Sequence, residues 1–276
     1  MHRRVLLLAL LSSCAAASAP EAQGRPDTVM LEELTWDELR DLQRAGTTTV
    51  ILGTAGTEQK GPHMAMGEHK FVLRYATEKI ARALGNAVVA PIIAYVPEGS
   101  WETPLRGHMA KAGTITLPED RFVELLLHAA RSLRAGGFRH VVLIGDSGGN
   151  QNGMRDAAAT LDAEWNGSGA RAHFIPDYYT KSMSDIHAYL EKLGHSREAI
   201  GTHAGMIDTS ELMFVNPSLV RRDKLAVGGG FPESGVSGDP TKATRALGEA
   251  LVKIKIDNAL AQIRASVAGA GVGESR

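Results

Sequence analysis

Near-continuous apolar runs alternate with amphipathic stretches along this chain, and the alternation predicts a mostly parallel α/β sheet. Apolar runs at residues 48–53, 87–94, 140–145 and 171–176 predict four strands. Apolar residues spaced for one helix face predict helices over residues 35–44, 69–84, 117–135, 151–165, 182–193, 211–220 and 241–267. Strands that are apolar on both faces need helices on both sides, so we expect a three-layer α/β/α sandwich.

Local signals place the ends of some elements. Thr35–Glu38 and Thr116–Glu119 have the spacing of capping boxes, which predicts that a helix begins at each. The polar stretch Thr202–Ser210 predicts a turn that leads into a helix from Glu211. The long segment Tyr95–Gly113 separates a strand from a helix, and we expect such a loop to serve as a lid over a site.

The N-terminus carries the signals of export. A basic start is followed by an apolar run at residues 5–11, which predicts a signal peptide over residues 1–19 that is too short to span a bilayer. The only cysteine, Cys14, closes a Leu-Ser-Ser-Cys sequence that resembles a lipobox, so we expect a periplasmic lipoprotein anchored through Cys14. Plain cleavage among residues 15–19 is the alternative. We expect a tether over residues 20–30, one domain over 31–268 and a flexible tail over 269–276.

Charge narrows the choice of partners. The formal net charge is −1 at pH 7, and no basic stripe runs along the chain, which gives no support for binding nucleic acid. Glu58 lies just past the first predicted strand and Asp146 just past the third. Since parallel strands end at one edge of a sheet, these two carboxyl groups should converge there.

Four segments carry a family resemblance. They are Glu58-Gln59-Lys60-Gly61-Pro62-His63, Gly145-Asp146-Ser147-Gly148-Gly149-Asn150, His203-Ala204-Gly205 with Asp208-Thr209-Ser210, and the run from Gly235 to Thr244. In this order they resemble the signature segments of the creatininase (creatinine amidohydrolase) family over about residues 45–265. The resemblance implies a creatininase-like fold, two divalent metals with a bridging water that attacks an amide carbon, and a homo-oligomer, by analogy a hexamer.

The chain departs from the family pattern at its metal ligands. Lys60 stands where the family has a metal-binding His, and a protonated Lys cannot coordinate. His69 stands at the bridging Asp and Asp146 at a His, so an imidazole and a carboxylate have exchanged places. We therefore predict one divalent metal, zinc or else manganese, held by Glu58, His69 and Asp146 with one open position. Lys60 would replace the second cation and steady an oxyanion.

The resemblance suggests roles for the remaining site residues. His203 would pass a proton to the leaving nitrogen, and Asp208 would orient His203 or act as a fourth ligand. Gly148, Gly149 and Asn150 would let a substrate approach the backbone. The expected reaction is hydrolysis of a C–N bond in a small amide, lactam or formamide.

Two other functions stay open. A family fold that has lost its metals could keep Glu58, Lys60 and Asp146 as a buried salt bridge and bind a small periplasmic ligand. The sequence Gly-Asp-Ser-Gly-Gly around Ser147 also matches the nucleophile motif of chymotrypsin-like proteases and the Gly-Asp-Ser block of esterases. The first motif belongs to an all-β double barrel and the second lies near a mature N-terminus, so the context argues against a Ser147 nucleophile.

Overall fold

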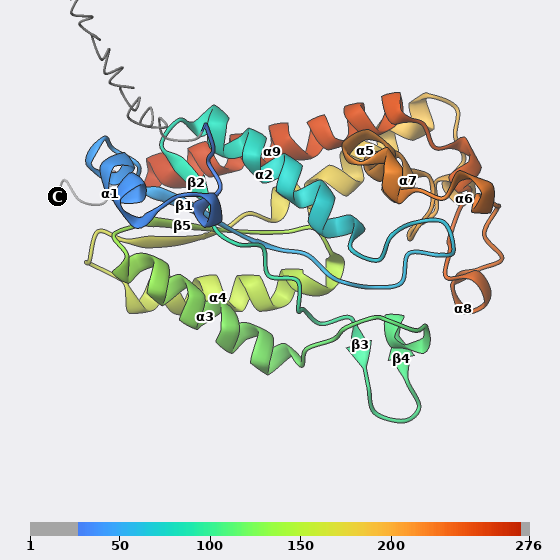
Figure 1. Ribbon diagram of the computed structural model, residues 1–276, viewed down its shortest axis with the longest axis horizontal. Helices are drawn as coiled ribbons and strands as arrows, with labels where there is room; N and C mark the ends of the chain where they lie inside the picture. Colours follow the sequence, from blue (N-terminus) through green and yellow to red (C-terminus); the bar gives the residue numbers. More distant parts are fainter. Residues whose placement is uncertain (1–26, 272–276) are drawn as a thin grey trace, which may run out of the picture.

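The structure, a computed structural model that describes residues 27–271, is built on one parallel sheet (Figure 1). Its strands are β1 (Thr49–Thr54), β2 (Ala87–Val89), β5 (His140–Gly145) and β6 (Arg171–Phe174), in the order β2-β1-β5-β6. Every neighbouring pair is parallel, and Val50 of β1 lies opposite Val88 and Val141. All four carboxyl ends therefore point to one edge of the sheet.

Helices cover both faces of the sheet, which confirms the three-layer α/β/α sandwich. Val50 and Leu52 of β1 pack with the buried side chains of α3 (Glu119–Ala135) and α4 (Gln151–Glu164). Ile51, which points to the other face, packs with α2 (Glu68–Leu84) and α9 (Arg245–Gly271). Figure 1 shows these two pairs of helices on opposite sides of the strands. The near-solid apolar strands thus bury alternate side chains in two separate cores.

The remaining elements gather around the carboxyl end of the sheet, apart from α1 (Trp36–Arg44) at the opposite end (Figure 1). They include the helices α5 (Thr180–Lys192), α6 (Arg197–Ile200), α7 (Met206–Val215) and α8 (Phe231–Ser234). The segment predicted as a lid forms the hairpin β3 (Gly99–Ser100) and β4 (Arg106–Gly107), which projects from the body. Short 3-10 helices follow at His108–Ala110 (η2) and Gly148–Asn150 (η3), with others at Leu31–Glu33, Pro176–Tyr178, Pro217–Leu219, Arg222–Lys224 and Pro240–Lys242.

Three predicted boundaries were wrong. The strand predicted to reach residue 94 ends at Val89. The Ala90 N–H still donates to the Ile51 carbonyl, but the next bond to β1 comes from the Ile93 N–H to the Gly53 carbonyl, so the regular alternation is broken at Pro91. The box at Thr35 forms, but that at Thr116 does not, since Pro118 is the N-cap of α3 and the Thr116 hydroxyl bonds the Gly99 carbonyl. Helix α7 begins at Met206, inside the stretch predicted as a turn, because its polar residues face the site and not solvent.

The predicted signal peptide, with Cys14, lies outside the described residues, as does the part of the predicted tether before residue 27. Val29 and Met30, at the end of the predicted tether, pair with β2: the Val89 N–H donates to the Val29 carbonyl at 2.8 Å, and Met30 is buried. Within residues 27–271, no helix combines the length and apolar character that crossing a bilayer requires.

A histidine pair at the amino end of the sheet makes stability depend on pH. His173 Nε2 lies 3.1 Å from His140 Nδ1, and its Nδ1 lies 2.7 Å from Ser266 Oγ. Burial lowers the pKa of His173 from 6.5 to about 4. Between these values the unfolded chain binds a proton that the folded chain does not, so stability should fall as the pH drops from 6.5 to 4.

Replacing His173 by glutamine should remove this acid sensitivity. We expect the slope of unfolding free energy against pH to flatten by up to roughly 1.4 kcal/mol per pH unit across that window. Denaturant unfolding at pH 5 and pH 7 measures it. The same change at His128, which is exposed on α3, should leave the slope as it is. Equal slopes for wild type and His173→Gln would contradict the assignment.

Candidate active site

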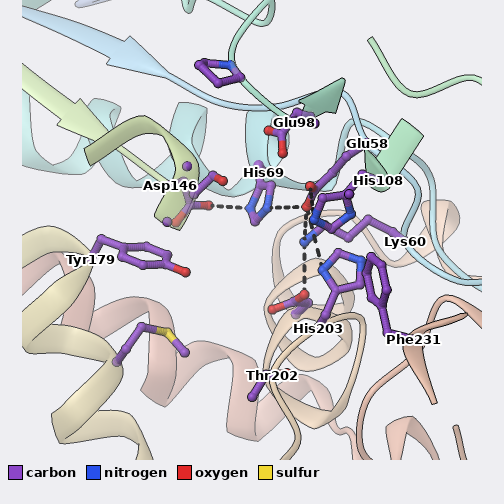
Figure 2. Close-up of a pocket in the computed structure, with 18 of the residues that line it drawn as sticks. Glu58, Lys60, His69, Glu98, His108, Asp146, Tyr179, Thr202, His203 and Phe231 are labelled. Atoms are coloured by element: carbon purple, nitrogen blue, oxygen red, sulfur yellow. Dashed lines mark hydrogen bonds and ion pairs between the residues drawn. The ribbon is translucent and has the colours of Figure 1, made fainter. Parts of the chain in front are cut away.

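A cavity of about 500 Å³ opens at the carboxyl end of the sheet, where the signature loop after β1 meets the loop after β5 (Figure 2). Glu58 and Lys60 enter it from the first loop, His69 from the first turn of α2, and Asp146 from the second loop, as the strand topology predicted for the two carboxyl groups. His203 and Asp208 come from α7 and the turn before it. Side chains far apart in the sequence therefore share one cavity.

Lys60 lies at the centre of a cage of carboxylates. Its Nζ is 3.0 Å from Asp208 Oδ2, 3.1 Å from Glu58 Oε1 and 3.2 Å from Glu68 Oε2, and the side chain is 1% exposed. Burial works against the ammonium, but Asp208, Glu68 and Glu58 together raise the pKa of Lys60 well above its usual value. Lys60 is therefore a fixed positive charge that cannot act as a ligand.

His69 lies between the two carboxylates with which it was predicted to bind a metal (Figure 2). Its Nε2 is 2.9 Å from Glu58 Oε1, whereas its Nδ1 is 3.5 Å from Asp146 Oδ2 and 3.2 Å from Glu68 Oε2. Burial and Lys60 oppose protonation, yet the carboxyl groups raise the pKa of His69 well above its usual value. Glu58, His69 and Asp146 thus form a row, with the carboxylates on opposite ring nitrogens, and do not surround one point.

A second buried ammonium, Lys255 of α9, holds the far end of this row. Its Nζ lies 2.9 Å from Asp146 Oδ1 and 2.6 Å from Glu211 Oε2. Lys255 was not predicted as a site residue, although its position in the sequence indicates burial. Lys255 lies between Val252 and Ala259, both buried, on the apolar face of a helix. A Lys on such a face needs a buried anion, and Asp146 and Glu211 provide two.

The projecting hairpin contributes Glu98 and His108. His108 Nε2 lies 3.0 Å from Glu58 Oε2. Burial, with Glu58 close by, raises the pKa of Glu98 to about 9. Neither Glu98 nor His108 was predicted as a site residue. The sequence showed only that both lie in the long segment Tyr95–Gly113.

His203 faces Glu58 from the opposite side. Its Nε2 lies 2.8 Å from the Gln59 carbonyl oxygen and its Nδ1 lies 3.8 Å from Glu58 Oε1. Burial lowers the pKa of His203 to about 4, so the ring is neutral at pH 7. Asp208 Oδ2 accepts from the Ala204 N–H at 2.8 Å and from Lys60, so Asp208 supports the ammonium and the loop.

Of the three residues predicted to contact substrate, two line the cavity and one does not. Gly148 and Gly149 line the cavity, but a Cβ at Gly149 would lie 2.7 Å from the Pro97 carbonyl oxygen, so that glycine is needed for packing. Asn150 is buried, and its Nδ2 donates to Thr54 Oγ1 at 3.2 Å, beneath the cavity.

Opposite charges meet throughout the site. Three basic groups have a raised pKa: Lys60, His69 and Lys255. Three carboxyl groups have a lowered pKa: Glu58, Asp146 and Asp208. Three others have a raised pKa, chiefly through burial: Glu68, Glu98 and Glu211.

In the described chain, two sets of three side chains could each hold a metal ion. In each set, one donor atom from every side chain lies within 4.8 Å of the other two. One is Glu58, His108 and His203, and the other is Glu68, His69 and Asp146. The predicted ligands are thus divided, Glu58 into the first group and the other two into the second.

Comparison with known proteins identifies the family. The sequence model of the family described as creatinine amidohydrolase matches residues 32–263. The chain belongs to the creatininase family. A creatininase-family relative, the mycofactocin precursor peptide peptidase of Mycolicibacterium smegmatis, is 28% identical over 222 residues, which cover 72% of this chain and 78% of the relative. The corresponding peptidase of Mycobacterium ulcerans is 26% identical over 248 residues, 78% of this chain and 84% of the relative.

Solved creatininases share the fold. A structure described as "Creatininase Mn" superposes with a TM-score of 0.72 at 21% identity, over 87% of this chain and 99% of that one. Another, described as a Zn-Zn type creatininase, has a TM-score of 0.71 at the same identity and the same coverage. The chain is thus a creatininase-family hydrolase with the family fold.

Proposed function

We propose that the chain hydrolyses a C–N bond in a small amide, lactam or formamide, with water and one divalent metal. The observation that carries the proposal is Glu58. It is a buried carboxylate on the cavity floor, with Lys60 and His69 against one oxygen and His108 against the other. Family membership supports the reaction type, since the family model is described as an amidohydrolase and relatives are peptidases.

The residues fit one ion better than two. Lys60 Nζ lies within 3.0–3.2 Å of three carboxylates, and an ammonium inside such a cage repels a second cation. Glu58 and imidazole nitrogens around it would hold the single ion. Zinc or manganese is the expected metal, because solved creatininases are described with each. When bound, a divalent ion lowers the pKa of a bound water toward neutrality.

The chain's own residues would manage charge and protons. Lys60 supplies the positive charge of the missing second ion. The Gln59 carbonyl oxygen lies 2.8 Å from His203 Nε2 and the Gln59 side-chain nitrogen 3.0 Å, so this ring nitrogen is already engaged within the protein. Glu98 lines the cavity, and its raised pKa of about 9 keeps the carboxyl group protonated at neutral pH. We therefore assign to Glu98 the donation of this proton to the leaving nitrogen, after which its carboxylate would recover a proton from water.

Metal removal tests the function. The mature chain, stripped with a chelator, should lose hydrolysis of a panel of small amides, lactams and formamides. Zinc or manganese should restore it at about one ion per chain. Full hydrolysis in the stripped protein, or restoration only at two ions per chain, would contradict the single-metal mechanism.

A metal-free binding protein is the second candidate. It is favoured by the two buried ammonium groups, Lys60 and Lys255, which already lie against carboxylates of the site. Under this alternative the chain takes up neither zinc nor manganese, and small amides bind without being cleaved. Elemental analysis together with calorimetric titration of the amides separates the two functions.

Ser147 is not placed as a nucleophile would be. It lines the cavity, yet within residues 27–271 the cavity histidines bond to Glu58 and Gln59, and none bonds to the Ser147 hydroxyl. Ser147→Ala should therefore keep the amidase rate within about threefold, measured with the best amide of the panel. Loss of all activity in this variant, with metal irrelevant, would support a serine hydrolase.

Export and assembly remain proposals. We propose that Cys14 is lipidated after export and anchors the chain to the membrane from the periplasm. Cys14→Ser should release the protein into the soluble fraction, and unchanged fractionation would argue for plain signal cleavage. The homo-oligomer expected from the family, a hexamer by analogy, can be measured by light scattering.

A further inference from the structure

We propose that the metal-binding site of this chain is formed by Glu58, His108 and His203, so that the ion has moved from the family's ligand positions toward the cavity mouth. This inference rests on the proposed function and deepens it, because it names the ligands. A site of two imidazoles and one carboxylate suits zinc and leaves a position open for water. His108 lies outside all four signature segments, so the family pattern does not predict it.

One donor atom from each of Glu58, His108 and His203 lies within 4.8 Å of the other two, a spacing that one ion can bridge. His108 Nε2 lies 3.0 Å from Glu58 Oε2, and His203 Nδ1 lies 3.8 Å from the other oxygen of the same carboxylate, Oε1. Two ligand atoms on a tetrahedral zinc, each about 2.0–2.1 Å from it, lie roughly 3.4 Å apart. Glu58 Oε2 is buried, and among the described residues His108 Nε2 is its close partner. Both atoms are of the kind that ligates zinc, so an ion placed between the two side chains would bind both.

His203 has the hydrogen bonding of a metal ligand. His203 Nε2 lies 2.8 Å from the Gln59 carbonyl oxygen and 3.0 Å from the Gln59 side-chain nitrogen. The shorter contact favours a ring proton on Nε2, because a backbone carbonyl can only accept. The lone pair of Nδ1 then faces Glu58. Metal-bound histidines are commonly held in this way, with the second ring nitrogen donating to a carbonyl or carboxylate.

Phe231 fixes the two imidazoles against each other. The His108 and His203 rings lie with centroids 4.5 Å apart, and Phe231 packs its ring edge-on at 5.1 Å from the first and 5.4 Å from the second (Figure 2). Lys111, close in sequence to His108, donates to the carbonyls of Pro232 and Glu233 at 2.8 and 3.1 Å. These bonds join the segment that carries His108 to α8, which carries Phe231. The projecting hairpin is thereby held in place to present His108.

The other donor group is less suitable. Its donor atoms Glu68 Oε2, His69 Nδ1 and Asp146 Oδ2 lack hydrogen bonds in the described chain. Lys60 Nζ, however, lies 3.2 Å from Glu68 Oε2 itself, so an ion on that oxygen would face an ammonium. In the first group Lys60 contacts only Oε1 of Glu58, which leaves Oε2 for the metal. Glu68 also does not line the cavity, whereas all three members of the first group do.

Zinc titration of two histidine variants tests the assignment. Metal-stripped full-length protein is titrated with Zn²⁺ by calorimetry, and bound zinc is measured by elemental analysis. Wild type should bind one Zn²⁺ per chain. His108→Ala should weaken binding roughly 100-fold or more, while His69→Gln should stay within about tenfold, as expected for a neighbour of a ligand. His128→Ala, which removes an exposed histidine, controls for nonspecific binding and should match wild type.

The opposite pattern would overturn the proposal. If His69→Gln lost zinc while His108→Ala kept it, the ion would lie among Glu68, His69 and Asp146. Should His69→Gln not fold, the imidazole NMR signals of wild type decide: Zn²⁺ should shift those of His108 and His203 most. Because zinc is measured without substrate, one ion at His108 in a protein that cleaves no amide would support the site and reject the hydrolase.

Discussion

Replacing Lys60 by methionine is expected to destabilise the folded chain by about 3–5 kcal/mol, because removal of one partner leaves buried charges without compensation. Lys60 is 1% exposed and lies within 3.2 Å of Asp208, Glu58 and Glu68. Its loss would crowd three carboxyl groups in a space closed to water. Protonation of those groups would lower the cost, so the loss should be larger at pH 8 than at pH 5.

Urea unfolding at the two pH values measures this loss. Lys70→Met, which removes an exposed Lys from the first turn of α2, should change stability by no more than about 0.5 kcal/mol. The emptied cage of Lys60→Met should also accept a divalent ion, so manganese should raise the melting temperature of the variant more than that of wild type. A variant as stable as wild type at pH 8 would show that Lys60 carries no charge there.

Lys255→Met should have an effect of similar size, about 3–5 kcal/mol, for the same reason. Lys255 Nζ lies 2.9 Å from Asp146 and 2.6 Å from Glu211, and all three side chains are buried. Asp146 contacts His69, and His69 contacts Glu58. Loss of Lys255 would therefore also remove the ammonium that holds Asp146 at the end of this row of three side chains. We expect zinc affinity to fall by no more than about tenfold, because Lys255 reaches the ligand Glu58 only through Asp146 and His69.

The same helix offers a matched control. Lys253 lies two residues before Lys255 on α9, is 71% exposed and pairs with Asp257, so Lys253→Met should cost less than about 1 kcal/mol. The double change Lys255→Met with Glu211→Gln should recover part of the lost stability, because one uncompensated carboxyl group is removed with the ammonium. Additive losses in the double variant would show that Lys255 and Glu211 do not interact.

The fold was largely readable from the sequence because burial leaves a repeating signal. Val50, Ile51 and Leu52 are apolar in succession since both faces of β1 are covered, and that pattern is local. The errors arose where a single residue outweighed the pattern. The regular ladder of β2 is broken at Pro91, and Pro118 removed a cap. At α7 the polar residues were taken for a turn, although buried partners satisfy them: Thr209 bonds His63 and Ser210 accepts from Thr244.

By itself the sequence determined the family, the layered fold and the convergence of Glu58, Lys60 and Asp146, because strand ends of a parallel sheet must meet at one edge. Only the tertiary structure decided which oxygens and nitrogens face each other. It placed Asp146 and Glu58 on opposite nitrogens of His69, and it brought His108 from a projecting hairpin and Lys255 from the last helix. Such pairings depend on distances of a few ångströms between segments that are remote along the chain, and no local pattern records them.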